Sequence, residues 1–204
     1  MMVEVKKTRS ELKRSAILQG AIQAFKQYGV SDTSMDKIAE VAQVSKRTVY
    51  NHFESKELLV THIIKEIWCK NVVSYEVKYN PDITLKEQLI ELVENELSLS
   101  KQPETIELIR VALTHSINNP EMFNQELHQF FEQDTALVRW LKAAIADNRF
   151  KTMDPHKANE QIVSLLKGQA FWPQIIRFDP LLNDEEQSDL ANETVDMFLA
   201  YYQR

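Results

Sequence analysis

The scarcity of glycine is the feature that most restricts how this chain can fold. Its 204 residues include three glycines, Gly20, Gly29 and Gly168, and six prolines. An all-β fold needs many tight hairpin turns, and glycine is the residue that most of those turns require. Apolar side chains instead recur at helical spacing over long segments of the chain. The sequence therefore predicts an all-α protein.

Local start and stop signals divide the chain into helices. Thr8 with Glu11 forms a capping box at the start of the first helix, and Thr84 begins a later helix in the same way. Thr33 or Ser34 can cap the second helix, with Asp36 favourable in its first turn, and Ser45 can cap the third. The predicted helices cover residues 9–28, 35–42, 46–53, 55 to about 80, 85–100, 103–117, 120–148, 155–178 and 184–202. We expect a break near Gln133 and a kink at Pro173, because proline removes a helical hydrogen bond.

Charge is distributed unevenly along the chain. Residues 1–56 carry ten lysines and arginines against six acidic residues, a net charge of +4, whereas residues 57–204 carry −10 of the total of −6. A small basic module on an acidic protein points weakly to a polyanionic partner. No secretory signal or membrane-spanning apolar run is visible, so we expect a cytoplasmic protein with no membrane partner. In a reducing compartment the single cysteine, Cys69, is expected to pack within the fold.

Two short helices joined by a turn, residues 35–42 and 46–53, form a candidate helix-turn-helix. Ala39 offers a small side chain where the second helix crosses the first, and Val49 and Phe53 supply apolar contacts. The exposed face of the second helix is left with side chains that can donate hydrogen bonds to phosphates or base edges: Lys46, Arg47, Thr48, Tyr50, Asn51 and His52. The alternative is an ordinary polar helix that faces solvent.

The stretch GVSDTSMDKIAEVAQVSKRTVYNHFESKELL, residues 29–59, resembles the DNA-binding module of TetR-family transcriptional regulators. The spacing of the matching residues is the same as in the family from the glycine before the second helix to the Ser-Lys-Glu that opens the fourth. It implies a DNA-binding domain over residues 1–56, with the helix-turn-helix at 35–54, and a helical effector-binding and dimerisation domain over 57–204. It also implies DNA contacts from Lys46, Thr48, Tyr50, Asn51 and His52 and phosphate contacts from Ser34 and Lys56.

Two positions of this module depart from the family pattern. Gln43 stands in the turn, where the family commonly has glycine and the chain tends toward positive φ, at a cost of about 1 kcal/mol for another residue. Arg47 also stands where glycine is common. The added cation either strengthens phosphate binding or changes base preference, and the sequence leaves both readings open.

The rest of the chain resembles the C-terminal domain of the AefR-like TetR subgroup through its Pro-Glu-Met-Phe, Asp-Pro and Leu-Leu-Lys-Gly positions. The resemblance implies a homodimer in which the last two helices of each subunit pair. We place this interface on residues 161–176 and 190–202. A two-fold dimer also doubles the contacts of one short recognition helix over a palindromic DNA site.

Aromatic side chains and one histidine are candidates for an effector pocket: Trp68, Tyr75, His115, Phe123, Phe130, Phe131, Trp140, Phe171 and Trp172. An aromatic stripe at helical spacing is more often core or interface, and that alternative stays open. No convergent set of metal ligands is visible, so we expect neither a metal nor a cofactor.

These patterns favour a sequence-specific DNA-binding regulator, a repressor that a small-molecule effector releases from a palindromic operator. An activator of the same family is the nearest alternative. A small all-α enzyme belongs to a different class, and we do not expect one, because the sequence has no nucleophile elbow, phosphate-binding glycine loop or H-E-x-x-H cluster. A helical interaction module without a DNA role is the third hypothesis.

Overall fold

The computed structural model describes residues 8–118 and 133–204. Within these ranges the secondary structure is helical apart from one isolated antiparallel β-bridge between Phe150 and Gln203, which confirms the predicted fold class. The chain forms two compact units. Of the described residues, the first unit holds 8–65 and 107–118, and the second holds 66–106 and 133–204.

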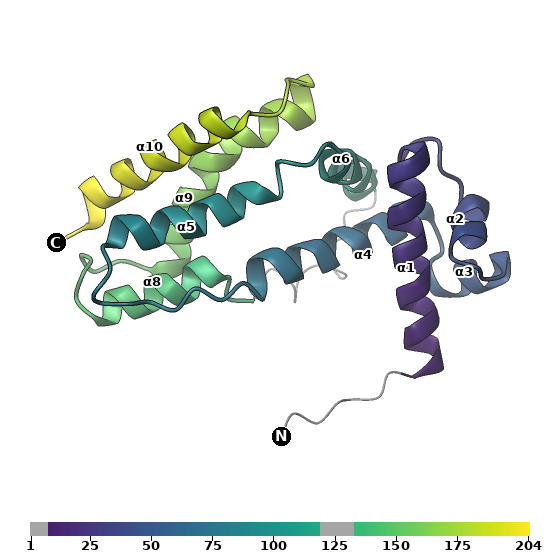
Figure 1. Cartoon of the computed structure of the whole chain (residues 1–204), viewed down its shortest axis with the longest axis horizontal. Helices are drawn as coiled ribbons and strands as arrows, with labels where there is room; N and C mark the ends of the chain where they lie inside the picture. Colours follow the sequence, from purple (N-terminus) through teal and green to yellow (C-terminus); the bar gives the residue numbers. More distant parts are fainter. Residues whose placement is uncertain (1–7, 119–132) are drawn as a thin grey trace. The chain divides into compact units, whose positions relative to one another are not determined.

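The first unit contains the three helices predicted for the basic end of the chain. They are α1 (Arg9–Tyr28), α2 (Met35–Val41) and α3 (Lys46–His52), followed by the first part of α4 (Lys56–Trp68). The described part of α6 (Pro103–Asn118) from Glu107 onward belongs to the same unit. The short helix α2 packs against both α1 and α3 (Figure 1). Because α1 holds α2 and α2 contacts α3, this packing fixes the orientation of α3.

Gly29 ends α1 as the sequence predicts. Its φ of 80° lies in the region that favours glycine, and its N–H donates to the Phe25 carbonyl over 2.8 Å. The chain can then turn sharply into the segment before α2. There the buried hydroxyl of Thr33 donates to the Gly29 carbonyl over 2.6 Å, which holds that turn closed.

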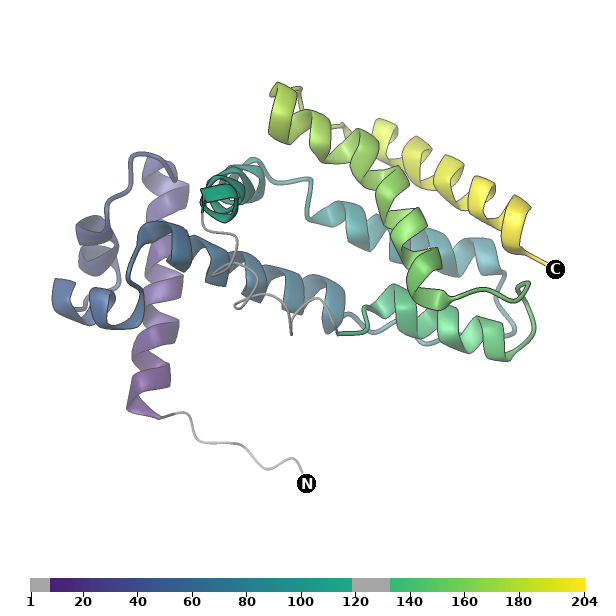
Figure 2. The same cartoon turned by 180° about the vertical axis from the view of Figure 1, so that it is seen from behind.

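The second unit is built on α5 (Leu85–Ser98), α8 (Ala136–Ala146), α9 (Pro155–Ala170) and α10 (Asp184–Tyr202). In this unit α10 packs along both α5 and α9, and α8 packs against α5 and α9 (Figures 1 and 2). Trp140 is buried at the centre of the shared core, where its indole N–H donates to the Gln88 side-chain oxygen over 3.1 Å. This bond satisfies the one polar group that the large ring brings into the core.

The prediction that the fourth helix reaches about residue 80 is wrong. The helix α4 ends at Trp68, a π-helical segment η1 (Cys69–Val73) follows, and the chain then runs without helix to the start of α5. Side chains from elsewhere in the second unit bond this segment: Arg139 donates to the Tyr75 carbonyl, and the Asn80 N–H donates to Gln88, each over 2.8 Å. Because these partners satisfy the backbone, the segment does not need helical bonds.

Two predictions about proline and helix breaks have different outcomes. The 155–178 helix does not kink at Pro173: α9 ends at Ala170, and a π-helical turn η2 (Pro173–Arg177) follows. Proline has no N–H to donate and its ring crowds the preceding turn, so the helix stops before it. At the break expected near Gln133, residues 133–135 are not helical, and Thr135 caps α8 by accepting from the Val138 N–H. The earlier part of that predicted helix lies outside the described residues.

No helix among the described residues is long and apolar enough to span a bilayer. The same residues contain no group of three or more metal-ligating His, Cys, Asp or Glu side chains.

Candidate nucleic-acid interface

Two serines determine where the short helices α2 and α3 begin. The Ser34 hydroxyl oxygen accepts from the Lys37 N–H over 3.2 Å, and the Ser45 hydroxyl oxygen accepts from the Thr48 N–H over 3.1 Å. Each satisfies an N–H that the first turn of a helix leaves without a partner. Ser45 was predicted as a cap, and of the two candidates for α2, Thr33 and Ser34, Ser34 takes the role.

The turn between these helices depends on Gln43. Its φ is 53°, in the left-handed region expected for this position, although the residue is not glycine. The next N–H, that of Val44, donates to the Ala39 carbonyl over 3.0 Å. The turn is therefore tied back to α2, and α3 leaves it in a fixed direction.

One side of α3 is anchored in the core of the first unit. Val49 and Phe53 are almost completely inaccessible to solvent, as is Ile38 of α2. Ala39, the small residue expected at the crossing, is buried as well. Full burial of each large apolar side chain stabilises the fold by roughly 1.5–3 kcal/mol. The anchor holds the opposite side of α3 in a defined position.

The opposite side of α3 carries the polar residues that the sequence singled out. Tyr50 keeps 44% of its surface exposed although it is aromatic. The remaining candidates on this helix are exposed or half-buried: Lys46, Arg47, Thr48, Asn51 and His52. The structure therefore brings six predicted side chains onto one short helix, all of them able to donate hydrogen bonds.

Lys46 is already paired within the motif. Its ammonium lies 2.8 Å from the Asp36 carboxylate on α2, and this hydrogen bond is the main reason that the pKa of Lys46 is raised. Sequence reasoning treated Asp36 only as a favourable acid in the first turn of α2. The pair crosses the turn and joins residues ten positions apart, so no local spacing rule indicates it.

Lys56 has a structural role in this state of the protein. Its ammonium donates to the carbonyls of Val30 and Ser31, each over 3.0 Å. These bonds tie the start of α4 to the segment before α2. One ammonium proton remains for another acceptor.

Family models match both parts of the chain. Residues 17–63 match the model described as bacterial regulatory proteins, tetR family, and residues 87–204, more than half of the chain, match the AefR-like transcriptional repressor C-terminal domain. A solved structure of a TetR family transcriptional regulator from Pseudomonas syringae pv. tomato is 38% identical over 95% of this chain and 98% of that one, with a TM-score of 0.72. The chain belongs to the TetR family of transcriptional regulators.

Two Escherichia coli K12 proteins of this family have similar sequences over a shorter length. The HTH-type transcriptional regulator RutR is 32% identical over 80 residues, which is 38% of this chain and 38% of RutR. The probable acrEF/envCD operon repressor is 34% identical over 96 residues, 43% of this chain and 40% of the relative. This TetR-family chain therefore matches about two fifths of the length of these relatives.

The aromatic candidates for a TetR-family effector pocket have different surroundings. Trp140 and Tyr75 belong to the core of the second unit or pack against it, as the core alternative expects. Trp172 is 44% exposed, and Trp68 and Phe171 are half-buried. The side chain of His115, together with Phe123, Phe130 and Phe131, lies outside the described residues.

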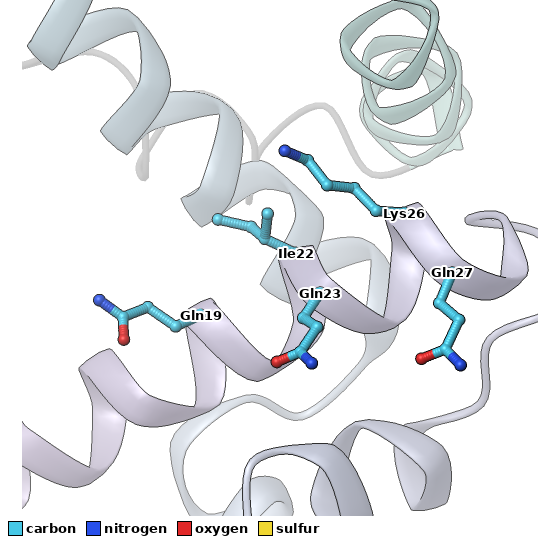
Figure 3. Close-up of a pocket in the computed structure, with 5 residues that line it drawn as sticks. All are labelled: Gln19, Ile22, Gln23, Lys26 and Gln27. Atoms are coloured by element: carbon cyan, nitrogen blue, oxygen red, sulfur yellow. The ribbon is translucent and has the colours of Figure 1, made fainter.

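A shallow hollow of about 470 Å³ lies along α1, within the TetR-family DNA-binding module (Figure 3). Its lining residues are Gln19, Ile22, Gln23, Lys26 and Gln27. Figure 3 shows that the glutamine side chains of residues 23 and 27 point away from the Lys26 ammonium. The polar groups do not converge on one point, so the hollow lacks the arrangement of a specific ligand site.

Proposed function

We propose that this TetR-family chain is a sequence-specific DNA-binding repressor and that α3 enters the major groove of its operator. The observation that carries the proposal is the two-sided character of α3. Val49 and Phe53 fix one side in the core, and the other side presents Arg47, Asn51 and Tyr50 to solvent. A helix that is held rigidly and exposes several donors can contact base edges and phosphates together.

The polar residues are proposed to divide between bases and backbone. Arg47 and Asn51 suit base edges, whereas Tyr50, His52 and Lys56 suit phosphates. Ser34 and Thr48 remain candidates. The Ser34 oxygen accepts from the Lys37 N–H, and the Thr48 hydroxyl lies 2.7 Å from the Ser45 hydroxyl. A hydroxyl that accepts at its oxygen still has its own proton to donate to a phosphate.

The operator-binding form is proposed to be a homodimer that pairs through α9 and α10. Large apolar side chains are exposed on these two helices: Leu165, Met197 and Tyr201. Together with Phe198 and Tyr202 they line a hollow of about 670 Å³ between α9 and α10. The hollow is also lined by the polar residues Lys157, Glu160, Gln161 and Ser164. Exposed large apolar side chains favour association, and a two-fold dimer would present two α3 helices to half-sites about 34 Å apart or a multiple of it.

Control by a small molecule is the part of the proposal that rests on family membership. A ligand that binds the second unit would shift the dimer between forms with different operator affinity. A ligand that binds without changing operator affinity would rule this part out.

The direction of regulation can be tested by transcription in vitro. The template is a promoter that contains the site bound by the protein, and the purified protein is added at increasing concentration. A repressor lowers the amount of transcript, and an activator of the same family raises it. An unchanged amount with the site fully bound would contradict both.

A further inference from the structure

The two adjacent cations at the start of α3 differ in their surroundings. The Lys46 ammonium forms its 2.8 Å ion pair with Asp36, and both side chains are more than half exposed. Arg47 is exposed and forms no hydrogen bond or ion pair with any residue that the structure describes. One cation is therefore partly neutralised inside the motif, and its neighbour keeps its full charge and all its donors.

Helical spacing places these cations on different edges of the exposed face. Residues four apart on a helix are neighbours, so Lys46 lies beside Tyr50 and Arg47 lies beside Asn51. The Lys46 edge faces Asp36 of α2. The Arg47 edge has no acidic partner among the described residues. It carries the Arg47 guanidinium and the Asn51 side-chain amide, two planar groups that suit base recognition.

The chemistry of the two cations also differs. The arginine guanidinium is a planar fork that can donate two parallel hydrogen bonds to O6 and N7 of guanine. The lysine ammonium is a point charge without this geometry. If Lys46 moved toward DNA, the Asp36 carboxylate would be left without its cation close to the phosphates. The repulsion between these negative charges would weaken binding to DNA.

We propose that Arg47 reads a guanine in each half-site of the operator, while Asp36 restrains Lys46 from competing for base edges. This inference rests on the proposed DNA-binding function and adds the base and the residue that selects it. Arg47 is a specificity-determining residue, and Asp36 is a positioning residue that acts through Lys46.

The test selects bound sequences from a random double-stranded DNA library with four full-length proteins: wild type, Arg47→Ala, Arg47→Lys and Lys46→Ala. The wild type is expected to enrich a two-fold symmetric motif with a guanine in each half. Both Arg47 variants should lose the preference at that position alone, because Arg47→Lys keeps the charge but not the fork. Binding to the wild-type motif should fall by about 5- to 150-fold in Arg47→Ala. Lys46→Ala should still enrich sequences with a guanine at that position.

A fifth variant, Asp36→Asn, tests the restraint on Lys46. Freeing the ammonium should strengthen binding to all sequences alike and make the dependence on salt steeper, because another phosphate contact becomes available. Circular dichroism of every variant checks that the helices are intact.

The outcomes separate this inference from the proposed function. A guanine preference that survives in both Arg47 variants, or that disappears in Lys46→Ala, would overturn the inference and leave the DNA-binding function in place. A wild-type protein that enriches no motif would overturn the proposed function and the inference with it.

Discussion

Gly20 of α1 and Ala42 at the end of α2 approach so closely that no side chain fits between them. A Cβ atom on residue 20 would lie 2.6 Å from the Ala42 Cβ and 2.8 Å from its Cα and N atoms. Real Cβ contacts are longer, so this glycine lets α2 pack directly on α1. Because α2 carries the turn to α3, the contact contributes to the placement of the proposed recognition helix.

Gly20→Ala should destabilise the protein. Alanine favours a helix interior by about 1 kcal/mol over glycine, but the new methyl would press on backbone atoms that cannot move aside, and such overpacking costs about 1–3 kcal/mol. The steric cost should exceed the gain, and urea denaturation measures the difference. Gly168→Ala is the matched control, because no atom that the structure describes in the same subunit lies within 4 Å of its new methyl, and it should be neutral or stabilising. A stabilised Gly20→Ala protein would contradict the packing.

Lys56→Met should lower the free energy of unfolding by about 1 kcal/mol, because the carbonyls of Val30 and Ser31 lose their donor. Lys56 is half-buried, and screening by solvent keeps the effect below the range for hydrogen bonds to charged groups. Lys13→Met on α1 removes an exposed lysine and should leave stability unchanged. Equal stability of the two variants in urea denaturation would show that the Lys56 bonds contribute nothing measurable.

Met197→Glu should convert the proposed dimer to a monomer. The side chain of Met197 is 59% exposed on α10, and an interface over it would have to bury an unpaired carboxylate in the variant. Leu12→Glu changes a side chain of similar exposure, 55%, on α1 and should remain dimeric. Sedimentation velocity at micromolar concentration distinguishes the two species. A dimer that persists in Met197→Glu, or a monomeric wild type, would contradict the proposed interface.

Glu96 on α5 should make the protein less stable as the pH rises. Burial raises the pKa of its carboxyl from 4.5 to about 7, although the Lys167 charge opposes the rise. The folded protein then holds a proton that the unfolded chain releases, so stability falls between about pH 4.5 and pH 7 and levels off above.

The measurement for Glu96 is urea denaturation at pH 5 and pH 8. The wild type should lose roughly 1–3 kcal/mol more than Glu96→Gln over this interval. Glu94→Gln, two residues away and exposed, should behave as the wild type does. If Glu96→Gln shows the same pH dependence as the wild type, the carboxyl does not titrate in this range.

Helix starts could be predicted from sequence because their causes are local. The capping boxes of Thr8 with Glu11 and of Thr84 with Glu87 are both formed, as is the Ser45 cap of α3. A cap requires only a short side chain and an N–H two or three residues later, and both are visible in the sequence.

Features that depend on contacts between distant residues could not be predicted in this way. The end of α4 depends on side chains that bond residues 75–80 from the other helices of the second unit. The Asp36–Lys46 pair depends on the angle between α2 and α3, and the partial burial of Glu96 depends on how α5 packs in its unit. In the candidate site the residue types could therefore be predicted from the sequence. The groups that already bind the Lys46 and Lys56 ammoniums within the protein could not.

Nuclease footprinting of the DNA upstream of the protein's own gene tests the central claim most directly. The titration uses the wild type and Tyr50→Ala at several salt concentrations. We predict that the wild type protects a palindromic site with an affinity that falls steeply as salt increases, and that Tyr50→Ala protects it at least tenfold more weakly. A wild-type protein that protects no site at low salt, or a Tyr50→Ala variant that protects the site equally well, would contradict the account.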